Sequence, residues 1–239
     1  MTFLALASIS HLTALAYDRY LTICKPFLAT RIHNSYFLAS VSIFLCWFYA
    51  LLWGAFPLCG WSSYDLESDK LRCSIHWASR DIKDQAYIVF LFIFCFIIPV
   101  GVMSFSFLRV RRELHLMQGR AANLFGRESK AAKDNIRAER RHTQLAITMC
   151  AVFILTWTPY TLLSFWASFF THIAEAPVAL ATTAALIAKS STIFTPIIYS
   201  VVHKKFRQSL RNTPFGRFLC LKTKVAPGET STPEFTQQQ

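Results

Sequence analysis

The chain has 239 residues, of which 54% are hydrophobic, 15% are aromatic and only 16% are charged, and its formal net charge is +12. A soluble domain usually carries about 25% charged residues, so this composition excludes an ordinary soluble globular protein. The basic residues flank long uncharged stretches, which makes membrane topology the first interpretation of the charge and nucleic-acid binding a poor second.

Four stretches have the length of a membrane span. They lack Asp, Glu, Lys and Arg, apart from one lysine in the last of them: residues 32–64, 85–108, 142–174 and 176–203. Each exceeds the roughly 20 residues that an α-helix needs to cross the hydrocarbon core. The sequence therefore predicts an all-α integral membrane protein in a lipid bilayer.

Five long helices are expected, the first of them without a flank before it. In chain order we expect helix 1–24, helix 37–60, an outer loop 61–84, helix 85–112, a basic loop 113–136, helix 137–170 and helix 177–202. A short amphipathic helix should follow at 203–212, and the polar tail 223–239 should be disordered. Met1 opens directly in apolar sequence, so we expect that an N-terminal part is missing.

The positive-inside rule sets the orientation. Lys and Arg number ten from Arg109 to Arg141 and seven from His203 onward, whereas residues 60–84 contain four basic and five acidic residues. The basic segments should lie in the cytoplasm, with residues 60–84 outside. We expect a multi-pass protein of the plasma membrane with a cytoplasmic C-terminal tail.

One lysine interrupts the last apolar stretch. In "LIAKSSTIFTPIIY", Lys189 lies near the middle of the expected helix, where a cation costs roughly 2.5–3.5 kcal/mol or more. It could extend toward the interface or face a wet cavity. Alternatively it is a nucleophile, because burial disfavours the charged form of a lysine and a neutral amine attacks aldehydes to form a Schiff base.

An aromatic stripe precedes this lysine by one helix. "FILTWTPY" places Phe153, Trp157 and Tyr160 on one helical face, with Pro159 bending the helix. Such a stripe is more often ordinary helix packing. Beside a buried lysine, it could form an apolar slot for a flat polyene.

Charged residues also mark the inner ends of two helices. Asp18 and Arg19 end the first helix, and Glu139 begins another. Terminal charges are usually a solvated boundary. If Arg19 bonded Asp18 and Glu139 at once, however, it would clamp two helix ends, and breaking the clamp would act as a two-state switch.

Taken together, these motifs resemble a known family. "DRY" at 18–20, "WTPY" at 157–160, Lys189 within "AKSS", "TPIIY" at 195–199 and "HKKFR" at 203–207 are similar to opsins, the retinal-binding group of rhodopsin-like G-protein-coupled receptors. Non-visual opsins of the neuropsin or peropsin type look nearest. The resemblance covers residues 1–222 and implies the last five helices of a seven-transmembrane bundle, beginning within the third.

The resemblance implies a set of functional residues. Lys189 would hold retinal, 11-cis or all-trans, as a Schiff base, and the pocket would be lined by Trp157, Tyr160, Phe153, Phe96, Trp77 and Ile75. Glu67 would be a possible counterion, although a solvated loop acid is equally reasonable. The switch toward a G protein would comprise Asp18, Arg19, Tyr20, Glu139, Pro196 and Tyr199. Cys73 would form a disulfide whose partner is missing from this chain, and no metal site or catalytic residue is implied.

Several positions depart from the family pattern. Thr195 stands where the family usually has Asn, Phe107 replaces a tyrosine that helps to hold the active state, and Cys95 occupies a pocket position where histidine is common. These changes bear on G-protein activation more than on retinal binding.

Four functions remain open from the sequence. The first is a light-sensing receptor that activates a heterotrimeric G protein, with arrestin as a possible further partner, and is not an enzyme. The others are a retinal photoisomerase with little signalling, a receptor for a different ligand, and a truncated opsin without activity.

Overall fold

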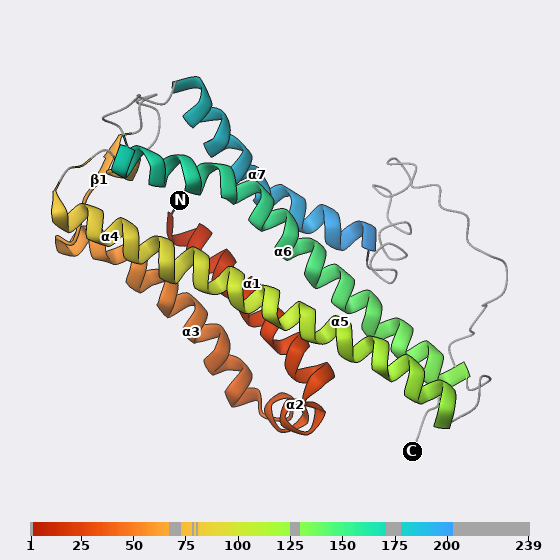
Figure 1. The fold of residues 1–239 in the computed structure, drawn as a ribbon. Helices are drawn as coiled ribbons and strands as arrows, with labels where there is room; N and C mark the ends of the chain where they lie inside the picture. Colours follow the sequence, from red (N-terminus) through yellow and green to blue (C-terminus); the bar gives the residue numbers. More distant parts are fainter. Residues whose placement is uncertain are drawn as a thin grey trace, which may run out of the picture.

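The computed structural model describes residues 2–66, 73–77, 79, 81–124, 130–170 and 178–202, with only the backbone described at helical residues 118–124, 130–133, 135, 178, 199, 201 and 202. Its elements are α1 (Thr2–Cys24), α2 (Pro26–His33), α3 (Tyr36–Ala55), η1 (Phe56–Cys59), β1 (Tyr64–Leu66), β2 (Cys73–Ile75), α4 (Ile82–Phe92), η2 (Ile93–Ile97), α5 (Ile98–Leu124), α6 (Lys130–Phe170) and α7 (Val178–Val202). Because α4, η2 and α5 run on as one (Figure 1), the described chain has five long helical rods, namely α1, α3, α4–α5, α6 and α7.

Four of these rods are long and apolar enough to cross a membrane, by length and composition: Tyr36–Cys59, Ile82–Met117, Ile136–Phe170 and Ala179–Ile198. Their outward faces are rich in exposed Leu, Ile and Phe. Exposing such apolar faces to water would cost free energy, whereas in a bilayer they contact lipid tails, which are also apolar. The expected membrane helices are therefore confirmed, with ends shifted by a few residues.

The first helix, α1, is the central one. It packs against α3, α5 and α6, and its buried side chains are small or branched, among them Ala7, Ala16 and Ile9. Polar residues are tolerated here because they bond within the bundle: Ser10 donates its hydroxyl to Ala7 O at 2.9 Å and lies 3.2 Å from Cys46 O on α3. Protein rather than lipid covers this helix, which explains why it is less apolar than the other four.

The inner connections differ from the prediction. The predicted extent of the basic loop, 113–136, is wrong, because α5 continues to Leu124 and α6 already begins at Lys130. Leu, Met, Gln, Glu, Arg, Ala and Lys dominate these residues, and all of them favour helix. Both helices therefore extend beyond their apolar spans. The sequence interpretation also missed α2, whose first residue, Pro26, suits the first helical position.

Two tyrosine hydroxyls satisfy carbonyls that prolines leave without a helical donor. Trp53 O has Pro57 four residues ahead, where no N–H exists, and Tyr87 Oη of α4 donates to it at 2.7 Å. In η2, Ile98 N–H bonds Ile93 O, and Pro99 offers no N–H to Phe94 O. Tyr49 Oη of α3 donates to that carbonyl at 2.8 Å.

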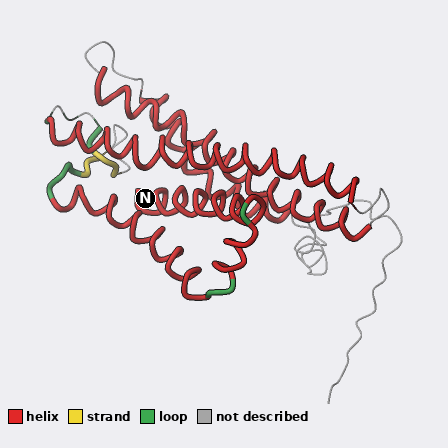
Figure 2. Tube along the Cα trace, turned by 60° about the horizontal axis from the view of Figure 1, so that its bottom comes forward, coloured by secondary structure: helices red, strands yellow, loops and turns green. Residues whose placement is uncertain are grey.

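A two-stranded hairpin covers the outer end, at the upper left of Figure 1 and in yellow in Figure 2. β1 and β2 are antiparallel, with Tyr64 opposite Ile75 and Asp65 opposite Ser74. The hairpin is tied to α3 because Tyr64 Oη donates to Gly54 O at 2.8 Å. Burial raises the pKa of the Tyr64 phenol, which keeps the hydroxyl protonated as a donor. The sequence predicted this segment only as a loop.

Candidate ligand pocket and inner switch

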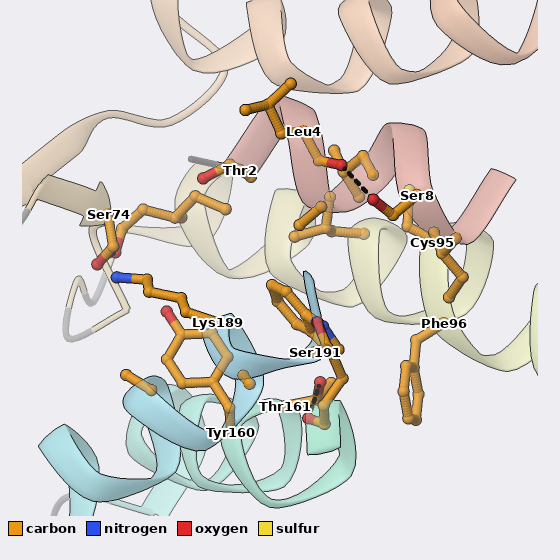
Figure 3. Close-up of a pocket in the computed structure, with 18 of the residues that line it drawn as sticks. Thr2, Leu4, Ser8, Ser74, Cys95, Phe96, Tyr160, Thr161, Lys189 and Ser191 are labelled. Carbon is orange, nitrogen blue, oxygen red and sulfur yellow. Dashed lines mark hydrogen bonds between the residues drawn. The ribbon is translucent and has the colours of Figure 1, made fainter. Parts of the chain in front are cut away.

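A cavity of about 250 Å³ lies below the hairpin, between α1, α4, η2, α6 and α7. Small-molecule sites commonly occupy about 300–1,000 Å³, so this cavity is slightly smaller than that range. Its described lining is mainly aliphatic and aromatic, with a few polar groups. Figure 3 shows these side chains converging from separate elements onto one space.

The structure brings together every described residue that the sequence assigned to the pocket: Ile75, Trp77, Phe96, Phe153, Trp157, Tyr160 and Lys189 all line the cavity. Ile75 and Trp77 come from β2 and the turn after it, Phe96 comes from η2, and the others come from α6 and α7. Four parts of the chain that are far apart in the sequence thus meet at one cavity, as the family resemblance implied.

The aromatic residues form a continuous wall. The rings of Phe153 and Trp157 are stacked with centroids 5.5 Å apart. Trp157 meets Tyr160 edge-on at 6.0 Å, and Tyr160 meets Trp77 edge-on at 6.2 Å. Edge-to-face and offset pairs at these distances are favourable. The wall joins α6 to the hairpin and lines one side of the cavity with aromatic rings.

Lys189 is the twelfth of 25 residues in α7. Small neighbours on the same helix, Ala184, Ala185 and Ala188, are buried and let α7 approach α6 closely. The lysine side chain extends into the cavity beside the Tyr160 ring, with Nζ directed toward Ser74 of β2 (Figure 3). Among the described lining residues it is the only Lys, Arg, His, Asp or Glu, so an amine in an apolar chamber is the chemistry that distinguishes this cavity.

A hydrogen bond fixes the Trp157 ring. Its Nε1–H donates to Ser191 Oγ at 3.0 Å, across the α6–α7 interface. Ser191 is buried and lies two residues after Lys189. The ring that touches the cavity is therefore coupled to the helix that carries the amine.

Two predicted roles at the outer mouth stay predictions. Glu67 lies outside the described residues, as do the expected C-terminal helix and tail. Cys73 is exposed, lines the cavity and is a free thiol in the structure. The acid of the described hairpin, Asp65, is 60% exposed and has His76 Nε2 3.8 Å from its Oδ2, which places it at the solvent surface of the hairpin.

At the inner end, the carboxylate of Asp18 contacts two basic side chains. Asp18 Oδ2 pairs with Arg19 Nη2 at 2.8 Å, and Asp18 Oδ1 lies 2.7 Å from His33 Nε2 on α2. Arg19 Nε and Glu139 Oε2 are buried without a hydrogen-bond partner. The Asp18 half of the expected clamp is thus present in this conformation, and the Arg19–Glu139 contact is not formed through these atoms.

The remaining switch residues surround this group or lie on α7. Tyr20 packs against a small core of Ile23, Val110 and Leu114, and its ring is 5.8 Å from that of Phe105. Pro196 lies inside α7, as expected. The side chain of Tyr199 is outside the described residues.

Sequence reasoning missed three residues that the structure places at these sites. Ser74 and Ser191 are single hydroxyls without a motif of their own, so only the folded structure reveals them. His33 is separated from Asp18 by fifteen positions, and the helix that brings it back was not foreseen. A proline two residues after "DRYLTIC" was the one available signal for that helix.

These features define a receptor of the seven-transmembrane class. Residues 1–199 match the family model described as 7 transmembrane receptor (rhodopsin family). The chain belongs to that family.

Its relatives are opsins. The chain is 30% identical to visual pigment-like receptor peropsin from Mus musculus over 231 residues, covering 97% of the chain and 65% of that protein. It is 31% identical to parapinopsin from Ictalurus punctatus, covering 87% of the chain and 57% of that protein. The crystal structure of squid rhodopsin matches with a TM-score of 0.81 at 28% identity, covering 93% of this chain and 64% of that one.

These matches confirm the recognition of a non-visual opsin-like receptor and the predicted partial seven-helix fold. The chain spans between 38% and 65% of the length of the eight curated relatives compared.

Proposed function

We propose that this protein is a light-sensing opsin in which Lys189 carries retinal as a Schiff base and illumination leads to activation of a heterotrimeric G protein. The observation that carries the proposal is the position of Lys189. Its primary amine belongs to the only Lys, Arg, His, Asp or Glu in the described lining of a largely apolar, aromatic-walled cavity.

The residues present suit retinal. A long apolar polyene needs an apolar chamber, and the aromatic rings of Phe153, Trp157, Tyr160 and Trp77 line this one. The aldehyde end needs an amine, which Lys189 provides at one side of the chamber. Lys189 would hold the group through its amine nitrogen, as a C=N bond formed with loss of the aldehyde oxygen as water. When bound, retinal supplies light absorption and a light-driven change of shape.

The protein's part is to orient the group and respond to it. Trp157 lies in the wall and is hydrogen-bonded to Ser191, so a push on its ring acts on both α6 and α7. α6 is 41 residues long and reaches from the cavity to the inner end. Movement of this rod at the pocket therefore changes the spacing between Glu139 and Arg19, which is the kind of two-state helix shift that switching requires.

The inner surface is suited to an intracellular protein partner. The described ends of α5 and α6 carry Arg109, Arg111, Arg112, Arg137, Arg140 and Arg141, and most of these are exposed. We propose a G protein as the partner, a plasma-membrane location with the C-terminal tail in the cytoplasm, and arrestin as a further possible ligand of the same surface. Glu67 is proposed as a counterion and Cys73 as half of a disulfide.

Chemical trapping tests the retinal site directly. Membranes that contain the protein are incubated with 11-cis retinal in the dark and then treated with borohydride, which reduces a C=N bond to a stable amine. Mass spectrometry should find the retinyl group on Lys189. A retinyl group on another lysine, or none on folded protein, would contradict the proposal.

A further inference from the structure

The geometry points to His33 as a positioning residue that sets how Arg19 is held at the inner end of the bundle. We propose that it does so through Asp18, and that it thereby links α2 to the switch. The inference rests on the proposed signalling function and extends it to a residue outside the motif "DRY".

The short helix α2 has few other means of staying in place. It has eight residues, and a helix of this length is not stable by itself in water. Ala29 is its one buried residue, Lys25 at its start provides no side-chain cap, and Phe27 is 94% exposed. The contact between His33 Nε2 and Asp18 Oδ1, at 2.7 Å, is therefore a main tie between α2 and α1.

The contact with His33 occupies Asp18 Oδ1, which could otherwise accept a second hydrogen bond from Arg19. A guanidinium and a carboxylate often form two parallel hydrogen bonds. Here Asp18 gives only Oδ2 to Arg19, at Nη2, while its Oδ1 faces His33. Arg19 Nε is left buried without a partner. His33 thus keeps the Asp18–Arg19 pair single-bonded and leaves Arg19 easier to release.

The partial burial of the three side chains is consistent with a structural role for this contact. Arg19 is 23% exposed and Asp18 is 33% exposed, so both lie partly shielded from water. His33 is 45% exposed and approaches from the solvent side. The histidine is thus the member of the group that a movement of α2 displaces first.

Loss of His33 has two expected consequences. α2 loses its tie, and its amides should exchange hydrogen about tenfold faster, because hydrogen bonds to charged groups are among the stronger ones in proteins. Asp18 regains both oxygens for Arg19, which should slow G-protein nucleotide exchange in illuminated membranes several-fold.

The test compares three variants of the expressed protein in membranes. His33→Ala removes the donor, and His33→Gln restores one through its side-chain amide. Arg31→Ala is the matched control, since Arg31 is exposed and lies on the same helix. Hydrogen exchange of peptides covering α2 and light-stimulated nucleotide exchange on a purified G protein are measured for each.

The proposal expects faster α2 exchange and slower nucleotide exchange in His33→Ala, both recovered in His33→Gln and both unchanged in Arg31→Ala. Unchanged α2 exchange in His33→Ala would overturn the tie, and faster α2 exchange with unaltered signalling would overturn the link to Arg19. If the illuminated wild type activates no G protein, the proposed function fails, while α2 exchange still decides whether His33 holds the helix.

Discussion

The outer half of the protein and its inner end are organised by different kinds of contact. Around the cavity, apolar and aromatic side chains pack from several segments, and tyrosine hydroxyls bond carbonyls left open by prolines. At the inner end, a few charged groups share partners, and Arg19 Nε, Glu139 Oε2, Ser106 Oγ and Thr143 Oγ1 are buried without a hydrogen-bond partner. In the outer half, Ser62 Oγ and Trp77 Nε1 are also buried without one.

This difference matches two tasks. A close-packed region resists rearrangement, so the outer half is suited to hold a ligand in one orientation. Buried polar atoms without partners are costly where they stand, and other arrangements of the same helices can satisfy them. Four of the six atoms of this kind among the described residues lie at the inner end, and they include both members of the expected Arg19–Glu139 pair. We therefore expect the inner end to rearrange more readily, and the predictions below test this contrast.

The largest expected effect concerns the amine in the outer half. Lys189→Ala should abolish covalent retinal capture completely, because no other described lining residue is an amine. Borohydride trapping with radiolabelled retinal measures the loss. Lys83→Ala, at the exposed start of α4, is the matched control and should retain full labelling. Labelled Lys189→Ala would mean that the attachment site lies elsewhere.

The proline-linked hydroxyls should matter next. Tyr87→Phe leaves Trp53 O buried without its donor, and an unsatisfied buried acceptor costs about 1–3 kcal/mol. The free energy of unfolding in detergent should fall by that amount. Tyr36→Phe should have no effect, since Tyr36 is 91% exposed. Equal stability of Tyr87→Phe and wild type would show that the outer half is not held by this bond.

The bond between the wall and α7 should have a smaller effect. Ser191→Ala removes the acceptor of Trp157 Nε1–H, and a typical hydrogen bond contributes about 0.5–1.5 kcal/mol to stability. A double-mutant cycle with Trp157→Phe isolates the coupling between the two side chains. Ser190→Ala is the control, because that hydroxyl bonds the backbone of its own helix. Strictly additive losses would contradict a Trp157–Ser191 coupling.

The smallest effect is expected at the inner end. Glu139→Gln removes a buried charge whose Oε2 has no partner here, and it also weakens any Arg19–Glu139 pair formed in another conformation. Both effects favour an inner end in which Glu139 does not hold Arg19, so nucleotide exchange in the dark should rise a few-fold. Asp134→Asn is the matched control, because Asp134 is exposed. An unchanged dark rate would count against Glu139 as part of the switch.

The two regions also differ in how far the sequence predicts them. Three pocket residues follow from helical periodicity, because Phe153, Trp157 and Tyr160 share a face whatever the details of packing. Ile75, Trp77 and Phe96 were assigned to the pocket only by the family resemblance. Side-chain burial in an apolar chamber is not directional, so the correct face is enough to bring its members together. The amine of Lys189 was foreseen for the same reason, as a lone cation deep in an apolar helix.

Other features depend on geometry that periodicity does not contain. Whether Arg19 bonds Asp18, Glu139 or both is decided by ångström-scale helix positions, which differ between conformations. The tie from His33 requires the unforeseen helix α2. The β1–β2 hairpin was missed because its strands have three residues each, too few to show an alternating pattern. The lengths of α5 and α6 were underestimated because the charged residues between the two apolar stretches were interpreted as a loop.

The central claim is that the cavity holds retinal on Lys189 and responds to light. The most direct measurement is the absorption spectrum of the purified protein with 11-cis retinal, recorded in the dark and after illumination, for the wild type and Lys189→Ala. The account predicts a band well to the red of protein absorbance that shifts on illumination and is absent from the variant. Folded wild-type protein without such a band, or a variant that retains it, would contradict the account.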